Sequence, residues 1–445
     1  MLSVNVNSEA GFVIAGARSW MEANDHSQTS VRSPRRAVRS RHIQGKPSMS
    51  AQIQEVVIVS GVRTAIGGFG GSLKSHRPGE LGGLLVAEAV RRAGIDAAGI
   101  GHCVFGNVIH SEPRDMYISR VAALQGGLSV DTPALTVNRL CGSGLQAIVS
   151  AAQQIQLGLC DAAVAGGAES MSLAPYHLPA GRFGQRMGDG VTVDPMVGAL
   201  QCPINRYHMG VTAENVAEQY GITREQQDAL AVESHKRAQR AVEQGYFKEQ
   251  ILPIELKSRK GSTFFDTDEH IRFDCTLGDL EPLKPVFKKE GGTVTAGNAS
   301  GLNDGAAALV LMARTRAEAE GRQVLARLVD YAVVGVEPSI MGIGPVPAIR
   351  QLLERNGLGV GDIDVFEVNE AFAAQALAVA QQLELPAERL NPNGSGISMG
   401  HPIGATGAII TVKAIHELAR VLGRYAIVSL CIGGGQGIAA LLRRD

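Results

Sequence analysis

Short apolar runs alternate along the chain with stretches in which apolar residues recur every three or four positions, which predicts strands alternating with helices. Glu55–Val59, Ala134–Val137 and Ala162–Ala165 are such runs. Between the last two lies a helical stripe made of Leu145, Ile148, Val149, Ala152 and Ile155. Gly158 suits the end of that helix. A strand, turn, helix and strand in this order predict a parallel α/β unit.

The C-terminal part of the chain repeats this order. A glycine-rich turn holds His401, a helix follows to an expected stop at Gly423, and Ile427–Leu430 has the pattern of the next strand. The apolar stripe of that helix includes Ile409, Val412, Ile415 and Ala419. A second repeated pattern is an apolar run that ends in asparagine, which occurs at Val104–Asn107 and again at Val365–Asn369. The repeat predicts two similar α/β halves that face each other.

Composition agrees with a tightly packed α/β enzyme of two or three domains. The chain has 445 residues, of which 45% are hydrophobic and 54 are glycine. Its longest apolar runs are too short for a membrane-spanning helix, so we expect a soluble protein and no membrane partner. The formal net charge of −1 gives no basic field, so nucleic acid is not an expected partner.

Residues 171–302 interrupt the repeat with more charge, more proline and irregular stretches. Taken singly, the basic side chains of this segment are best explained as a solvated surface. They include Lys257, Arg259, Lys260, Arg272, Lys284, Lys288 and Lys289. Because long excursions without a function are uncommon, we expect the segment to carry binding residues.

Residues 1–48 differ from the rest of the chain. They hold seven basic and three acidic residues, with six of the basic ones between Arg32 and Lys46. One interpretation is a transit peptide, which would predict a mitochondrial protein. The other is a mispredicted start, with Met49 as the initiator. The upstream acids fit a transit peptide poorly, so we favour the second interpretation and expect a cytoplasmic protein.

Six cysteines without a secretory signal predict free thiols in a reducing compartment. None forms a Cys-x-x-Cys pair, and the histidines lack zinc-ligand spacing, so no metal site is expected. Four of the cysteines are best explained as small buried hydrophobic residues. These are Cys103, Cys160, Cys202 and Cys275.

Cys141 and Cys431 stand apart because each ends an apolar run and opens onto glycines. Glycine permits the close backbone approach that a substrate needs. Cys141 also begins a predicted helix, where free N–H groups and the helix dipole favour negative charge. We therefore expect a lowered pKa at Cys141 and a nucleophilic role for its thiol.

A nucleophilic thiol needs a base, and His401 in the matching turn of the second half is the candidate. A lone histidine in a loop is more often a surface residue. Asn369 and Glu370 lie at another strand-to-helix junction, where the simpler explanation is capping or burial. A catalytic role for His401, Asn369 and Glu370 becomes more credible because they occur together with Cys141 and Cys431.

At this point the sequence resembles the thiolase family, over residues 54–445. The resemblance rests on five ordered motifs, which are Asn138–Gly144, Gly297–Gly305, Asn369–Phe372, Gly400–Gly404 and Cys431–Gly435. Within the family the chain looks most like bacterial β-ketothiolases, notably in Asn391–Gly396.

The resemblance implies a duplicated thiolase-type fold with two similar α/β/α halves and an inserted loop domain. The implied N-terminal half is 54–170 plus 303–323, and the C-terminal half is 324–445. Residues 171–302 would form the loop domain that binds coenzyme A, and 1–53 an N-terminal extension. In this family dimers and tetramers are usual, so a homodimer or homotetramer is expected.

The implied activity is an acyl-CoA:acetyl-CoA C-acyltransferase acting on short chains. By similarity, Cys141 becomes acylated, His401 is its base, and Cys431 exchanges the α-proton of acetyl-CoA. One oxyanion hole would use the backbone N–H groups of Cys141 and Gly433. The other would use His401 and a water held by Asn369, while Glu370 would help to place His401 or Cys431.

The resemblance also carries over contacts with coenzyme A, whose thioesters are the expected substrates; no further cofactor is expected. The implied pantetheine channel holds His208, Met209, Phe287, Ser300 and Phe372. Arg272 is implied at the adenine end, although Asp268–Phe273 departs from the usual family segment.

Three other interpretations compete. A ketoacyl-synthase-like condensing enzyme shares the fold, but it lacks the segment that holds Cys431. A non-catalytic acyl-CoA-binding protein would be expected to have lost a catalytic residue. A dinucleotide-binding role for Gly433–Gly437 is the weakest, because no helix and strand follow that run.

Overall fold

The computed structural model describes residues 53–259 and 261–445. The arginine-rich segment and Met49 lie outside the described residues. The two interpretations of residues 1–48 therefore stay predictions.

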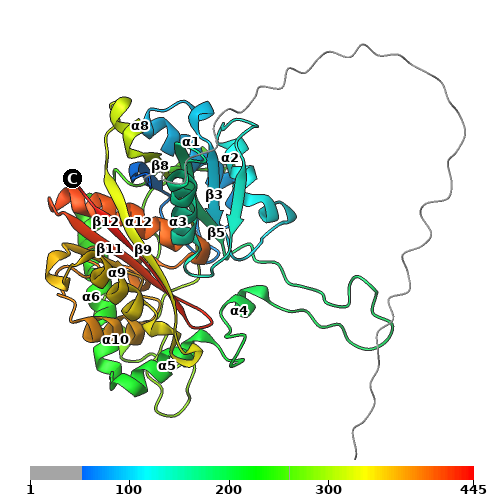
Figure 1. Cartoon of the computed structure of the whole chain (residues 1–445). Coiled ribbons are helices and arrows are strands. Elements are labelled where there is room, and N and C mark those ends of the chain that lie inside the picture. The colour runs from blue at the N-terminus through cyan, green and yellow to red at the C-terminus, as the bar shows by residue number, and fades with distance from the viewer. Residues whose placement is uncertain (1–52, 260) are drawn as a thin grey trace, which may run out of the picture. The chain divides into compact units, whose positions relative to one another are not determined.

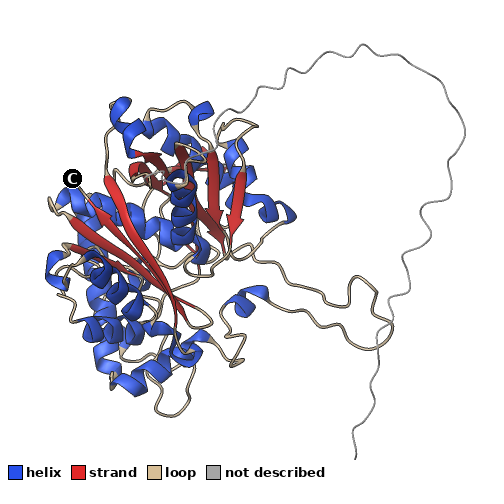
Figure 2. Ribbon diagram, viewed as in Figure 1, coloured by secondary structure: helices blue, strands red, loops and turns tan. Residues whose placement is uncertain are grey.

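In the described part of the chain one ten-stranded sheet forms the framework (Figure 2), with the strand order β10-β11-β12-β9-β1-β8-β5-β3-β4 and β2 paired to β8. Its strands are β1 (Val56–Arg63), β2 (Gly67–Gly68), β3 (His102–Gly106), β4 (Ala134–Val137), β5 (Ala162–Ser170), β8 (Asn303–Ala313), β9 (Ala326–Gly335), β10 (Val365–Val368), β11 (Tyr425–Ile432) and β12 (Gln436–Arg443). β6 (Ile254–Ser258) and β7 (Gly261–Phe265) form a separate hairpin.

The strand topology is duplicated, as the sequence repeat predicted. β3 pairs parallel with β5, and β5-β8-β1 continues antiparallel. In the second half β10 pairs parallel with β11, and β11-β12-β9 continues antiparallel. The two sets meet where β1 pairs with β9, with Val56 opposite Leu328. The duplicated α/β prediction is confirmed.

Helices cover both faces of the sheet. In the two halves they are α1 (Pro78–Ala93), α2 (Ile118–Gln125), α3 (Ser143–Gln156), α8 (Arg314–Ala319), α9 (Pro345–Asn356), α10 (Ala373–Leu383), α11 (Gly396–Met399) and α12 (Ile403–Arg420). Short 3-10 turns occupy Ala97–Gly99, Pro113–Tyr117, Pro338–Ile343 and Val360–Asp362.

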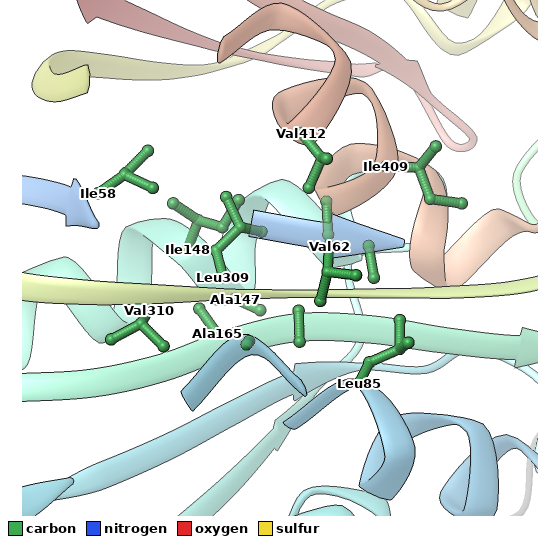
Figure 3. Packing of buried hydrophobic residues seen from close by; sticks show 14 of the residues in the cluster. Ile58, Val62, Leu85, Ala147, Ile148, Ala165, Leu309, Val310, Ile409 and Val412 are labelled. Atoms are coloured by element: carbon green, nitrogen blue, oxygen red, sulfur yellow. The ribbon is translucent and has the colours of Figure 1, made fainter. Parts of the chain in front are cut away.

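The main core lies between β1, β8 and β5 and the helices on either side. Figure 3 shows Ile148 of α3 and Val412 of α12 directed at these strands, with Leu85 of α1 on the opposite side. α3 and α12 also pack on each other. These two helices carry Cys141 and His401 at or near their N-termini, so their packing brings the two halves' reactive turns together.

Segment 171–302 is more regular than its composition suggested. It contains α4 (Pro195–Ala199), α5 (Met209–Tyr220), α6 (Arg224–Glu243) and α7 (Leu277–Leu280). Thr223 caps α6, because its hydroxyl accepts from the backbone N–H of Gln226. Helices α5 and α6 pack with α10 beside the second half (Figure 1).

The two predicted helix stops differ in outcome. Gly158 follows α3 with φ +70°, as expected. After α12 the positive φ, +54°, falls on Leu422 instead of Gly423. A Cβ at Gly423 would lie 2.8 Å from the Cβ of Asp364, so this glycine serves close packing and not the left-handed turn.

Over residues 53–259 and 261–445, no helix combines the length and the apolar character needed to cross a bilayer.

Candidate active site

Cys141 lies in a tight turn between β4 and α3. The preceding residue, Leu140, has φ +46°, which a leucine rarely adopts. Its backbone N–H donates to Oδ1 of Asn138 at 2.9 Å, and its carbonyl accepts from the hydroxyl of Ser143 at 2.7 Å. The Asn138 and Ser143 side chains thus hold the strained turn that presents the thiol.

Gly433, in the turn between β11 and β12, meets Cys141 from the second half. Its backbone N–H is directed at the Cys141 thiol, as is the backbone N–H of Cys141 itself. The two turns are in close contact, since a Cβ on Gly142 would lie 2.7 Å from Cδ1 of Ile432. Two N–H donors directed at one sulfur favour the thiolate form of Cys141.

The expected lowering of the Cys141 pKa is wrong. Burial raises the pKa of this thiol to about 11, and the charge of Glu169 adds to the rise. The N–H groups of Gly433 and Cys141 act in the opposite direction but are outweighed. A thiol with this pKa is protonated at neutral pH, so a nucleophilic role for Cys141 would require a base.

Cys431 is the penultimate residue of β11 and is fully buried. Burial raises its pKa most, and the neighbouring Cys141 raises it further. The structure thus brings the two thiols into one site from opposite halves. A negative charge on one thiol would disfavour ionisation of the other. The two thiols would therefore lose their protons one after the other.

His401 has the tautomer of a base. Its Nδ1 lies 2.7 Å from Oγ1 of Thr406, whose hydroxyl donates to the carbonyl of Pro402 at 3.0 Å. When the Thr406 hydroxyl donates to Pro402, it can only accept from Nδ1, which would place the imidazole proton on Nδ1 and leave the lone pair on Nε2. Burial lowers the pKa of His401 to about 4, so the ring is neutral at pH 7.

Asn369 and Glu370 follow β10, as predicted. Nδ2 of Asn369 lies 3.5 Å from Nδ1 of His401, so the amide borders the imidazole. Glu370 faces away from it and accepts from Ser234 at 2.6 Å and from Asn391 at 2.9 Å. No hydrogen bond within the described ranges joins Glu370 to His401 or Cys431.

Five of the six predicted coenzyme A contacts gather beside Cys431. Met209 and Phe372 share an apolar cluster with that thiol, and Phe287 packs against it. His208 stacks on Phe287 with ring centroids 4.6 Å apart. Ser300 joins through its backbone N–H, which donates to the carbonyl of Ala371 at 3.0 Å, next to Phe372.

Arg272, the sixth predicted contact, has a different setting. Its side chain is exposed, and its backbone N–H donates to Nδ1 of His235 on α6 at 3.1 Å. The neighbouring acids have structural partners. Asp268 pairs with the buried Arg63 at 2.7 Å, and Glu269 accepts from the backbone N–H of Gly68.

Two further side chains hold the His401 turn, and sequence reasoning did not single them out. Asn303 accepts from the backbone N–H of His401 at 2.9 Å, and Glu169 accepts from that of Gly404 at 2.8 Å. The signal for Glu169 was an acid at the end of the apolar strand Ala162–Ala168. For Asn303 there was only its place in the Gly297–Gly305 motif.

Comparison with known families agrees with this arrangement. A model of the thiolase N-terminal domain matches residues 56–315, and one of the thiolase C-terminal domain matches residues 322–444. The chain belongs to the thiolase family. Both family models cover the motifs on which the sequence resemblance rests, with Cys141 in the first and His401 and Cys431 in the second.

Among curated thiolases, the chain is 65% identical over 391 residues to the beta-ketothiolase BktB of Cupriavidus necator. That alignment covers 88% of this chain and 99% of the relative. The acetyl-CoA acetyltransferase of Pseudomonas aeruginosa is 48% identical, and that alignment covers 88% of this chain and 100% of the relative.

Two solved structures show the same thiolase fold. The acetyl-CoA acetyltransferase of Bacillus anthracis superposes with a TM-score of 0.85 at 49% identity, covering 88% of this chain and 99% of that one. Human mitochondrial 3-ketoacyl-CoA thiolase in complex with CoA gives a TM-score of 0.85 at 42% identity, covering 88% and 98%.

No group of three or more potential metal-ligating side chains occurs in the part of the chain that the structure describes. The reactive groups that the structure brings together are two thiols, one imidazole and backbone N–H donors. This set can exchange protons and transfer an acyl group.

Proposed function

We propose that this thiolase is an acyl-CoA:acetyl-CoA C-acyltransferase. It would join acetyl-CoA to a short acyl-CoA, or cleave a 3-ketoacyl-CoA with coenzyme A. The observation that carries the proposal is that Cys141 and Cys431 lie next to each other and that the turn of Cys141 packs closely on the helix that follows His401.

In the first step of cleavage, Nε2 of His401 takes the proton of the Cys141 thiol. The sulfur attacks the 3-keto carbonyl, and the C2–C3 bond breaks. The electron pair of that bond remains on C2 of the departing acetyl-CoA, and Cys431 supplies the proton that neutralises it. The product left on the enzyme is an acyl-Cys141 thioester.

In the second step, the Cys431 thiolate left by that transfer takes the thiol proton of coenzyme A. The coenzyme A sulfur attacks the acyl-Cys141 carbonyl, and the C–S bond to Cys141 breaks. His401 returns the proton to the Cys141 sulfur. Condensation is the same sequence in reverse, so the reaction should show ping-pong kinetics.

The N–H groups of Cys141 and Gly433 would stabilise the oxyanion that forms when a carbonyl on Cys141 is attacked. Removing one such donor typically costs about 3–4 kcal/mol of barrier. His401 with a water held by Asn369 would serve the other thioester oxygen. The position of Asn369 beside the imidazole supports this assignment.

Coenzyme A would approach Cys431 past the aromatic side chains of His208, Phe287 and Phe372. Their contacts with the apolar cluster around Cys431 support this path. Arg272 would take the adenine end, where its exposure leaves it free to meet a phosphate or a base. The substrates themselves supply the coenzyme, and we propose no further cofactor.

Short acyl chains, a cytoplasmic location and a homodimeric or homotetrameric assembly complete the proposal. The identity to BktB and to acetyl-CoA acetyltransferases supports the chain length. The bacterial sources of these relatives support the location.

The test is cleavage of acetoacetyl-CoA in the presence of coenzyme A by residues 49–445, with Cys141→Ala and Cys431→Ala beside it. We expect cleavage by the intact protein and loss of at least about a thousandfold in kcat in each variant. No cleavage of acetoacetyl-CoA or longer 3-ketoacyl-CoA by the intact protein would contradict the proposal.

A further inference from the structure

Glu169 is a buried carboxylate that joins the two halves beside the reactive groups. It is the penultimate residue of β5 and is 0% exposed. Its Oε1 accepts from Nδ2 of Asn107 at 3.0 Å and from the N–H of Ile109 at 3.1 Å. Its Oε2 accepts from the N–H groups of Val108 at 3.1 Å and Gly404 at 2.8 Å.

All four partners are N–H donors, so the pocket fits the ionised carboxylate. The amide of Asn107 cannot be reversed without loss, because its Nδ2 also donates to the carbonyl of Ala168 at 2.9 Å. Burial raises the pKa of Glu169 to about 8, Asp115 adds to the rise, and the N–H groups oppose it. Protonation would set an O–H against an N–H, so the four contacts are complete only for the ionised carboxylate, which is the major form above about pH 8.

The fourth donor belongs to the other half of the molecule. Gly404 lies in the first turn of α12, three residues after His401. The N-cap residue, Pro402, has no capping side chain of its own. Glu169 takes that place, where a carboxylate is stabilised by free N–H groups and the helix dipole. A Cβ on Gly404 would lie 2.7 Å from Oε2 of Glu169, so the approach requires glycine.

The beginning of the same turn is held from the first half as well. The N–H of His401 donates to Oδ1 of Asn303, whose Nδ2 donates to the carbonyl of Gly67 at 3.1 Å. First-half side chains thus fix both ends of the segment from His401 to Gly404. The first half is also the half that carries Cys141.

We propose that Glu169 is a positioning residue, which holds the His401 turn of the second half against the first half and so sets the reach from Nε2 of His401 to the Cys141 thiol. This inference rests on the proposed thiolase function. Glu169 would affect catalysis by positioning His401, without touching the substrate.

The charge of Glu169 supplies a second, separable effect. It opposes ionisation of Cys141 and so raises the pKa of that thiol. Loss of the charge should therefore favour the thiolate, while loss of the turn contacts should slow catalysis. A purely structural role predicts neither change at the thiol.

The first test variant is Glu169→Gln, which keeps the shape but turns an NH2 group toward one pair of N–H donors. We expect kcat for acetoacetyl-CoA cleavage to fall about tenfold or more, with KM changed less than about twofold, because small displacements of reacting groups are costly. Alkylation of Cys141 by iodoacetamide should meanwhile have its pH midpoint at a lower pH than in the wild type.

Two further variants separate contact from charge and from stability. Gly404→Ala pushes the turn away from Glu169 but keeps the charge, so we expect a loss of kcat with the alkylation midpoint unchanged. Glu417→Gln is the matched control, since Glu417 is a buried carboxylate on the same helix, α12, and accepts from Asn393 and Arg420 away from the His401 turn. It should lower thermal stability while kcat stays within about twofold.

Wild-type kcat in Glu169→Gln would overturn the inference, as would an equal loss of kcat in Glu417→Gln. If Glu169→Gln fails to fold, a normal kcat in Gly404→Ala would overturn it. If the wild type itself cleaves no 3-ketoacyl-CoA, the proposed function fails. In that case an unchanged alkylation midpoint in Glu169→Gln would also refute the coupling to Cys141.

Discussion

At the scale of single residues, the site depends on burial more than on charge. Burial raises the pKa of Cys141 to about 11 and lowers that of His401 to about 4, so both groups are neutral at pH 7. A neutral pair costs less to bury than a thiolate–imidazolium pair. Formation of the thiolate therefore requires transfer of its proton to a base.

Thr406 should decide which nitrogen of His401 is the base. In Thr406→Val the proton acceptor of Nδ1 is lost, so Nε2 would be protonated in a larger share of the molecules. We expect kcat for acetoacetyl-CoA cleavage to fall about tenfold, the size of a lost buried hydrogen bond. Steady-state kinetics measure this.

Thr411→Val is the matched control for Thr406→Val. Thr411 is also buried on α12, but its hydroxyl donates to the carbonyl of Gly407 at 2.7 Å and does not serve His401. Its kcat should stay near the wild-type value. Equal losses in the two variants would argue against a tautomer role.

His401 should also make stability depend on pH. Its folded pKa is lowered from 6.5 to about 4, so below pH 6.5 the unfolded chain binds a proton that the folded chain does not. Stability is therefore lost as pH falls from 6.5 to 4, by up to about 3 kcal/mol for this group. Urea unfolding of His401→Asn should show a smaller loss between pH 7 and pH 4.5 than the wild type.

The exposed His110 provides the control for this pH effect. His110→Asn should keep the wild-type slope of unfolding free energy against pH. A His401→Asn slope equal to that of the wild type would show that the imidazole is not buried in its neutral form.

At the scale of elements, the crossing of α3 and α12 brings the two reactive turns together. A Cβ on Gly144 would lie 2.6 Å from the backbone nitrogen of Ala408 and 3.0 Å from the carbonyl oxygen of Ala405. The helix N-termini can approach this closely only because a glycine lies between them. The distance between Cys141 and His401 is therefore set by backbone contact.

Gly144→Ala should force the two helices apart. We expect a loss of about 1–3 kcal/mol in stability, the usual cost of overpacking, together with a lower kcat. Gly198→Ala in α4 is the control, because a Cβ there meets nothing within 4 Å. Thermal unfolding and steady-state kinetics on both variants test this, and an unchanged Gly144→Ala would contradict the crossing.

The elements show where prediction from sequence worked. Apolar periodicity placed α3, α12 and the strands before and after them, because a parallel α/β unit buries whole apolar faces. Apolar periodicity did not identify Glu169 as a site residue. The pattern of one strand cannot show that this carboxylate accepts from the backbone N–H of Gly404 in the other half. The thiol pKa was mispredicted for a similar reason, because a helix terminus is visible in sequence while burial is a property of the assembled site.

At the scale of the molecule, a buried ion pair ties segment 171–302 to the sheet. Arg63 of β1 and Asp268 have side chains 0% exposed, and Nη1 of Arg63 lies 2.7 Å from Oδ1 of Asp268. Asp268→Asn would leave the guanidinium buried without its counter-charge, which costs about 3–5 kcal/mol. Chemical unfolding should show this loss.

Arg314 and Asp445 form the comparison pair at the surface, with 34% and 31% of their side chains exposed. Asp445→Asn should cost less than about 1 kcal/mol. A similarly small loss in Asp268→Asn would mean that the Arg63 pair does not hold the segment in place.

The central claim is that the two thiols do different work, and acetylation of the enzyme by acetyl-CoA tests it most directly. Acetyl transfer to Cys141 needs no α-proton removal, whereas condensation to acetoacetyl-CoA does. Mass spectrometry of Cys431→Ala mixed with acetyl-CoA should find acetyl-Cys141, formed more slowly because Cys431 no longer protonates the departing coenzyme A, while acetoacetyl-CoA formation is lost. Cys141→Ala should show neither. Condensation by Cys431→Ala at the wild-type rate, or acetylation of Cys141→Ala at another cysteine with activity kept, would contradict the account.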